Sequence, residues 1–241
     1  RKGDYVQTLK FLNEKQPSSD RAIALLDAGH DHMSIKEVRA QLSEIRELGP
    51  VPAKGEKKSR EALFRLEQYW DGQRRAGHTE FVPVLTDGVT TQLLLFPQSE
   101  ETKKSVSGWL AAITEPLTQV KRLGLWANSN LPAPAELLVR QHRLEIARKE
   151  KFWPLVVEDS ARLEALAADN LRPVRYQRAK ALYELKKYDE ALPLFTALAE
   201  EAKPDEIREF SRDLALDIWN QRREYDALID HADRWGRSKI R

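Results

Sequence analysis

The sequence predicts an all-α protein built from stacked, antiparallel helical hairpins, and three observations lead to this prediction. An aromatic residue recurs before a hydrophobic helix at Phe152, Tyr188 and Tyr225, with spacings of 36 and 37 residues. A period in this range is typical of helix–turn–helix units that bury their apolar faces against the neighbouring unit. Elsewhere, apolar residues follow the three- and four-residue spacing of amphipathic helices. Only ten Gly and twelve Pro occur, and many of the Pro stand where helices would begin.

Residues 1–48 are predicted to form an N-terminal helical hairpin region. Helices are expected over 4–15 and 21–28, followed by a helix that Ser34 caps and in which apolar residues recur every three or four positions. Residues 49–59, with the sequence GPVPAKGEKKS, are rich in Gly, Pro and Lys. This composition predicts a linker.

Residues 60–130 are predicted to form an irregular helical region. A helix is expected from Arg60 to about Gln73. The apolar residues of 103–126 follow helical spacing, but Pro116 interrupts them and would remove an interior hydrogen bond. Two helices or one kinked helix therefore fit this segment equally well.

The segment 80–96 (EFVPVLTDGVTTQLLLF) is the one stretch of the sequence with β character. Two apolar and β-branched runs flank the turn dipeptide Asp87-Gly88, which predicts a small β-hairpin. Pro83 would confine the first run to a sheet edge, and a lone hairpin would have to lie on a helical surface. The pattern leaves hairpin and helix both open.

Residues 131–241 are predicted to form the helical repeats. Three helix pairs fit, at about 135–149 with 154–168, 173–186 with 189–202, and 205–221 with 226–236. Pro134, Pro154 and Pro173 stand at predicted helix starts, where a missing N–H costs nothing.

The middle pair resembles the tetratricopeptide repeat. The residues in that family's order and spacing are Ala179, Leu182, Tyr188, Ala191, Phe195 and Leu198, followed by Pro204. The third pair keeps Leu216, Trp219, Tyr225 and Leu228, and the first keeps Ile146, Phe152 and Leu155, with Asp159 at the position of Phe195. The resemblance implies a right-handed superhelix over about the last hundred residues, with first helices that line a concave groove.

The resemblance also implies which side chains line that groove. Counted from the aromatic anchors, they are Arg140, Arg148, Tyr176, Lys180, Tyr183, Asp213, Asp217 and Asn220. This groove would be basic at one end and acidic at the other, with two tyrosines between. The pattern of Lys and Asn that forms the family's carboxylate clamp is absent, because the corresponding positions are Leu144, Lys180 and Asp217. The function expected is therefore a non-enzymatic scaffold or adaptor that binds a peptide or helix of a partner protein, but not a chaperone's terminal carboxylate.

The sequence gives no positive sign of catalysis, and we expect no catalytic residue, bound metal or cofactor. The chain has no cysteine, which excludes disulfides and thiolate zinc sites. His30-Asp31-His32 could bind zinc or act in acid–base chemistry, but a polar connector between helices is favoured. Phosphate-binding loops, HExxH and GxSxG motifs are all missing from the sequence.

Composition limits the partners and the location. The net charge of +2 gives no strong nucleic-acid signal, and no apolar run approaches the roughly 20 residues of a membrane span. Two alternatives stay open: a helical accessory domain of a larger enzyme or envelope-assembly protein, and binding of anionic surfaces or nucleic acid through the basic segment 234–241. The absence of cysteine and of an initiator Met favours the cell envelope or periplasm over the cytoplasm, with a targeting segment removed.

Overall fold

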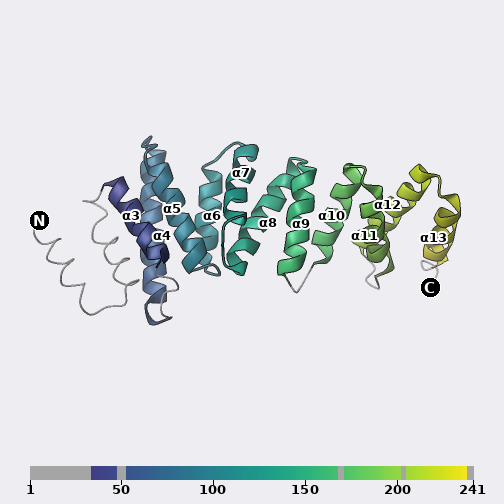
Figure 1. Ribbon diagram of the computed structural model, residues 1–241, viewed down its shortest axis with the longest axis horizontal. Helices are drawn as coiled ribbons and strands as arrows, with labels where there is room; N and C mark the ends of the chain where they lie inside the picture. Colours follow the sequence, from purple (N-terminus) through teal and green to yellow (C-terminus); the bar gives the residue numbers. More distant parts are fainter. Residues whose placement is uncertain (1–33, 48–52, 168–170, 202–204, 238–241) are drawn as a thin grey trace, which may run out of the picture. The chain divides into compact units, whose positions relative to one another are not determined.

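The fold is all-α, as predicted. The computed structural model describes residues 34–47, 53–167, 171–201 and 205–237, which form eleven helices and no strand (Figure 1). The predicted helices over 4–15 and 21–28 and the His30-Asp31-His32 connector lie outside the described residues.

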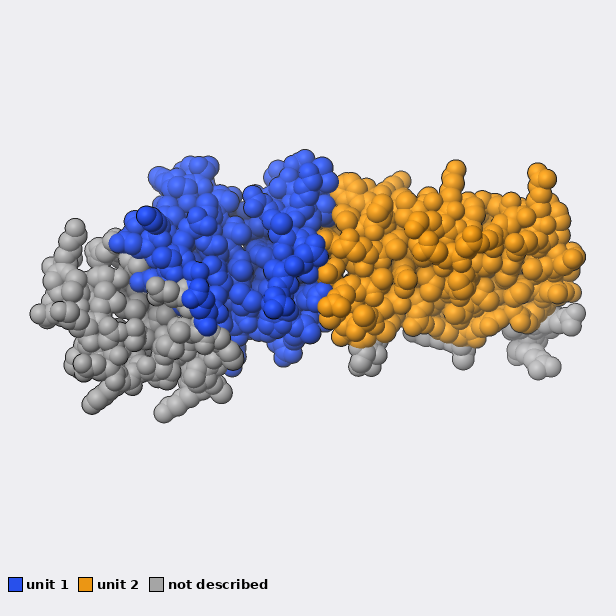
Figure 2. Space-filling model, in the orientation of Figure 1, with its two compact units in different colours: residues 1–139 blue, residues 140–241 orange. Residues whose placement is uncertain are grey.

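The chain divides into two compact units, residues 1–139 and 140–241 (Figure 2). The boundary falls within helix α8 (Ala133–Lys149), a few residues after the position 131 at which the sequence places the start of the repeats. Each unit is therefore described by itself.

Unit 1 contains α3 (Ile35–Glu47), α4 (Ala53–Arg75), α5 (Phe81–Leu95), α6 (Glu100–Ala111) and α7 (Pro116–Ala127). Ser34 caps α3 as predicted, because its backbone N–H donates to the Glu37 carboxylate at 2.7 Å and its hydroxyl accepts the Glu37 N–H at 3.3 Å. The structure also decides between the two readings of 103–126. Pro116 is the first residue of a separate helix, where its missing N–H breaks no hydrogen bond.

The predicted linker is shorter than expected. Helix α4 begins at Ala53 rather than Arg60, so the second half of the segment 49–59 is helical. A lysine-rich composition suits an exposed helix as well as a linker, and the ion pairs of Glu56 with Arg60 and of Lys57 with Glu61 stabilise this first part of α4.

The predicted β-hairpin over 80–96 is wrong, because these residues form helix α5. Pro83 lies in the first turn, where backbone N–H groups have no intrahelical acceptor. The β-branched threonines donate their hydroxyl hydrogens to the carbonyl oxygen four residues earlier, from Thr86 at 2.9 Å and from Thr90 at 2.7 Å. The same two oxygens accept the indole N–H of Trp109 and Trp126, at 3.1 and 3.0 Å. The threonines therefore join α5 to α6 and α7.

The dipeptide read as a turn has a packing role instead. Gly88 is buried where α4 crosses α5, and a Cβ at this position would lie only 2.8 Å from the Trp70 ring. Asp87 forms ion pairs with Arg39 and Arg46 of α3. Since α5 packs against α3, α4 and α6, it is the central helix of the part of unit 1 that the structure describes. Tertiary packing on several sides has outweighed the local β pattern.

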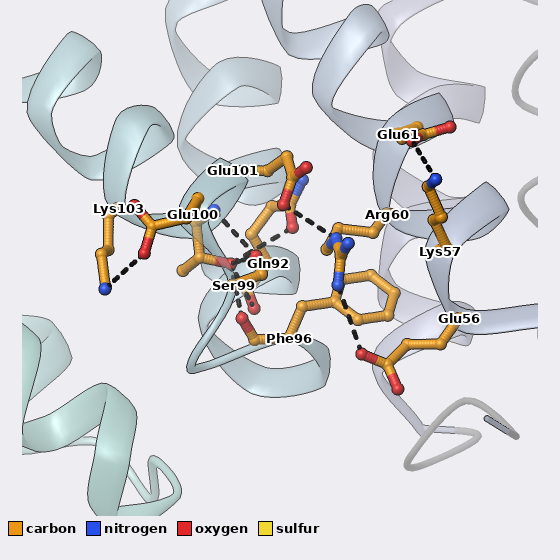
Figure 3. A network of polar contacts seen from close by, with 11 residues as sticks. Glu56, Lys57, Arg60, Glu61, Gln92, Phe96, Ser99, Glu100, Glu101 and Lys103 are labelled. Carbon is orange, nitrogen blue, oxygen red and sulfur yellow. Dashed lines mark hydrogen bonds and ion pairs between the residues drawn. The ribbon is translucent and has the colours of Figure 1, made fainter.

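A polar network holds the start of α6 against α4 and α5 (Figure 3). Ser99 caps α6 by accepting the Thr102 N–H at 3.0 Å, and the Thr102 hydroxyl donates to the Phe96 carbonyl at the end of α5, at 2.6 Å. Arg60 of α4 bridges Glu56 of its own helix and Glu101 of α6, at 3.5 and 2.8 Å. These contacts fix the α5–α6 connection on the surface of α4.

Unit 2 begins within α8 and continues with α9 (Trp153–Leu166), α10 (Arg172–Glu184), α11 (Tyr188–Glu200), α12 (Glu206–Arg222) and α13 (Tyr225–Arg237). The three helix pairs predicted from sequence are confirmed. Within the unit, contacts join α9 to α10, α10 to α11, α11 to α12 and α12 to α13, as stacked antiparallel hairpins require (Figure 1).

The core of unit 2 lies between α10, α11, α12 and α13. Phe195 is fully buried at its centre and makes edge contacts with Tyr176 and Tyr183, with ring centroids 6.2 and 6.5 Å apart. Ala179 and Ala191 are fully buried beside it and allow the close approach of α10 and α11 that the sequence predicts.

Candidate functional site

The three hairpins of unit 2 close with the same turn, which fixes how they align. Lys151, Lys186 and Arg223 each have a left-handed backbone, with φ of 58°, 59° and 59°. In each turn the next residue donates its N–H to a carbonyl five positions earlier, at 2.8 to 2.9 Å, which is the Schellman ending of a helix. The hairpins therefore repeat with spacings of 35 and 37 residues.

This alignment corrects the register of the first hairpin by one residue. Trp153, rather than Phe152, aligns with Tyr188 and Tyr225 as the first residue of the second helix. Phe152 instead matches Lys187, and both are N-cap residues with nearly the same backbone angles. Two adjacent aromatic residues made the anchor of this hairpin ambiguous in the sequence.

Arg140, predicted to line the groove, does not do so. It is 6% exposed and donates to the carboxylate of Asp159 at 2.8 Å, while Arg143 donates to the other oxygen of the same carboxylate at 2.6 Å. Asp159 is itself fully buried; burial raises the pKa of this carboxyl, and the hydrogen bonds from Arg143 and Arg140 oppose that rise. The charged residue that makes the first repeat degenerate thus joins α8 to α9 in a buried ion pair.

The corrected register places different α8 residues beside the predicted ones. Gln141 and Glu145 align with Tyr176 and Lys180, and both are exposed, whereas Leu144 is buried. Arg148 is exposed, as predicted, and aligns with Tyr183. Sequence reasoning missed Gln141 and Glu145 because the register of this hairpin is set by its left-handed residue, Lys151. A glycine at this position would have indicated the turn in the sequence, but a lysine does not.

Helix α10 presents Tyr176, Lys180 and Tyr183 on one side. Lys180 is exposed, whereas both tyrosines are half-buried because part of each ring packs on Phe195. The tyrosines are therefore both core residues and surface residues. This arrangement holds them in fixed orientations.

Helix α12 presents Asp213, Asp217 and Asn220 at equivalent positions. The Tyr183 hydroxyl donates to Asp217 at 2.5 Å and accepts from Gln221 at 3.2 Å, which brings the exposed sides of α10 and α12 together. The hydrogen bond to this carboxylate, with burial as a smaller cause, raises the pKa of Tyr183 to about 12, so the phenol stays a donor. Asp213 and Asn220 are exposed on either side of this contact.

We call the aligned residues of α8, α10 and α12 the first-helix face. Its members are Gln141, Glu145, Arg148, Tyr176, Lys180, Tyr183, Asp213, Asp217 and Asn220. Seven of the eight predicted groove residues belong to it, and Arg140 does not. Without Arg140 the basic end consists of Arg148 alone, beside Glu145, so the predicted charge gradient is weaker at that end. The acidic end on α12 remains.

The described residues contain no cluster of three or more His, Asp or Glu side chains placed to hold a metal ion. Within the same residues, no helix is both long and apolar enough to cross a bilayer.

Comparison with known proteins adds no family assignment. No protein-family model and no curated protein matches the chain. One solved structure, described as "Computational Design of Self-Assembling Cyclic Protein Homooligomers", is 14% identical and covers 100% of this chain and 97% of that one. Its TM-score of 0.18 is too low to support any conclusion about fold or function.

Proposed function

We propose that the protein is a tetratricopeptide-like adaptor that binds a segment of a partner protein along its first-helix face, without catalysing a reaction. The observation that supports this role most directly is the joining of α10 and α12 by Tyr183, Asp217 and Gln221. This contact sets two first helices side by side with their polar and aromatic residues on the same side. A partner segment can then contact several helices at once.

The residues of this face suit a binding role. Tyrosine contributes a large contact area with a polar tip, and it loses little conformational entropy when its ring is already fixed. Tyr176 and Tyr183 are fixed by Phe195, so most of that entropy is lost on folding rather than on binding. Lys180 and Asn220 add exposed hydrogen-bonding groups on either side.

The test uses substitutions that leave the core intact. Alanine at Tyr176 or Tyr183 would remove contacts with Phe195, so a loss of binding could reflect unfolding. Lys180→Ala with Asn220→Ala changes two exposed residues of the face, and Glu190→Ala with Asp230→Ala changes two exposed residues of the second helices α11 and α13.

The expected result is that wild type and control capture the same partner from the native cell extract, and that the face variant does not. Mass spectrometry would identify the partner, and circular dichroism would verify that all three proteins are folded. Equal capture by the face variant would reject the first-helix face as the binding site.

A further inference from the structure

An exposed aromatic residue lies in an acidic stripe on α12. Glu206, Phe210, Asp213, Asp217 and Asn220 follow one another at helical spacing, so they share one side of the helix. Phe210 is 50% exposed, which is unusual for a phenylalanine in a helix that packs against three others, α10, α11 and α13. Glu206 and Asp213 flank it along the stripe, Asp217 follows one turn beyond Asp213, and the stripe itself contains no basic residue.

The basic residues of α12 do not neutralise this stripe, because they have other partners. Arg212 is buried, donates to the Ala199 carbonyl at 3.3 Å and lies over the Trp235 ring. Arg208 pairs with Glu209 at 3.4 Å, and Arg222 pairs with Asp189 and Glu224. On α10, the described residues of the first-helix face beside this stripe are Tyr176, Lys180 and Tyr183, and Lys180 is the basic one among them. The exposed glutamate Glu184, at the end of the same helix, offsets it.

We infer that the partner segment is a basic peptide, rich in Arg or Lys and containing an apolar residue. This inference rests on the proposed function and names the class of partner for the same face. Long basic side chains place their methylene stems over an aromatic ring while their charged ends reach surrounding carboxylates, and arginine also stacks on the ring. Phe210 between Glu206 and Asp213 offers both contacts. An acidic or polyanionic partner would meet like charges along the whole stripe.

The probe is a fluorescein-labelled peptide of about ten residues in which Arg alternates with Ser around one central Leu. Two matched peptides replace every Arg by Glu or by Gln. Fluorescence anisotropy with the full chain would show binding of the Arg peptide that weakens several-fold when salt rises from about 50 to 500 mM, because exposed ion pairs are screened. The Glu peptide is expected not to bind.

Variants locate the site. Glu206→Gln with Asp213→Asn removes two exposed carboxylates and is expected to weaken binding of the Arg peptide by about fivefold, given the modest strength of exposed ion pairs. Phe210→Ser is expected to weaken it at least as much. Asp226→Asn with Asp230→Asn removes two exposed carboxylates of α13, outside the stripe, and is expected to have little effect.

Four outcomes would overturn the inference: equal binding of the Glu peptide, no binding of the Arg peptide at about 1 mM, equal weakening by the α13 control, or a self-associated chain whose copies cover the stripe. A further pattern would separate the two proposals: the Gln peptide binds, Lys180→Ala weakens this binding, and Glu206→Gln with Asp213→Asn does not. That pattern would reject a basic partner while keeping the proposed function. Unchanged partner capture by the face variant would instead reject the proposed function itself.

Discussion

Replacing Glu67 of α4 by Gln is expected to remove a pH dependence from the stability of unit 1. Glu67 is 1% exposed, and one of its oxygens is hydrogen-bonded to the Ser105 hydroxyl of α6. The other oxygen, Oε1, lies beside Gly88 and has no hydrogen-bond partner among the described residues. Burial raises the pKa of Glu67 from 4.5 to about 8, although the hydrogen bond from Ser105 opposes the rise.

The folded state therefore holds this carboxyl protonated at a pH where the unfolded chain ionises it. Its contribution to stability is fully present below the unfolded pKa of 4.5 and is lost as pH rises toward the folded pKa of about 8. One pKa unit corresponds to about 1.4 kcal/mol, so this residue should lower the free energy of unfolding by about 2.5 kcal/mol between about pH 5 and pH 7. Other charged groups near it, Asp71 and Arg75 of α4 and Lys104 of α6, line the adjoining hollow and remain in the variant.

Urea unfolding followed by circular dichroism would measure the free energy of unfolding at both pH values. Hydrogen exchange of peptides from α4 to α6 would show whether the change in stability lies in these helices. Glu67→Gln keeps the shape and the contact with Ser105 but cannot ionise. From about pH 5 to pH 7, the free energy of unfolding of the wild type should fall by about 2.5 kcal/mol more than that of the variant. Glu61→Gln, on the exposed side of α4, should behave like the wild type. Equal pH dependence of wild type and Glu67→Gln would refute the assignment of a protonated Glu67.

Three further substitutions test the packing and the turns, each by urea unfolding. Gly88→Ala should destabilise unit 1 by about 1 to 2 kcal/mol, because the overlap of the new Cβ with Trp70 outweighs the gain in helix propensity. Its control, Gly72→Ala, should be neutral or stabilising, because nothing lies within 4 Å of a Cβ at that position. Lys186→Gly should stabilise unit 2 by about 0.5 to 1 kcal/mol by relieving the left-handed backbone, whereas Lys187→Gly, at φ −85°, should not. Asp159→Ala should destabilise unit 2 by about 3 kcal/mol or more, because two buried guanidinium groups lose their shared carboxylate. A neutral effect at Gly88 or Asp159, or equal effects at Lys186 and Lys187, would contradict the respective contact.

The helix boundaries of unit 2 followed from local signals in the sequence. Pro154 and Pro173 stand in the first turns of α9 and α10, and Asp205 caps α12 by accepting the Arg208 N–H at 3.1 Å. These features act over three or four residues, so they are readable without knowledge of the tertiary structure.

The features that sequence reasoning missed depend on contacts between distant residues. Segment 80–96 is a helix because Trp70, Trp109 and Trp126 pack against it or bond to its threonines, and no local pattern reveals those partners. Arg140 and Asp159 look like surface residues until the fold brings α8 and α9 together. The candidate face was largely predictable because it follows from the helix period. Its errors, the inclusion of Arg140 and the omission of Gln141 and Glu145, came from the one-residue shift at Phe152.

Site-specific photocrosslinking tests the central claim, partner binding on the first-helix face, most directly. A photoreactive phenylalanine analogue would replace Lys180 on α10 or, in a matched chain, Ala197 on α11; both positions are exposed. Irradiation in the native cell should give a covalent adduct with a partner protein from position 180, and none from position 197. An adduct from position 197 alone, or equal adducts from both, would contradict binding on the first-helix face.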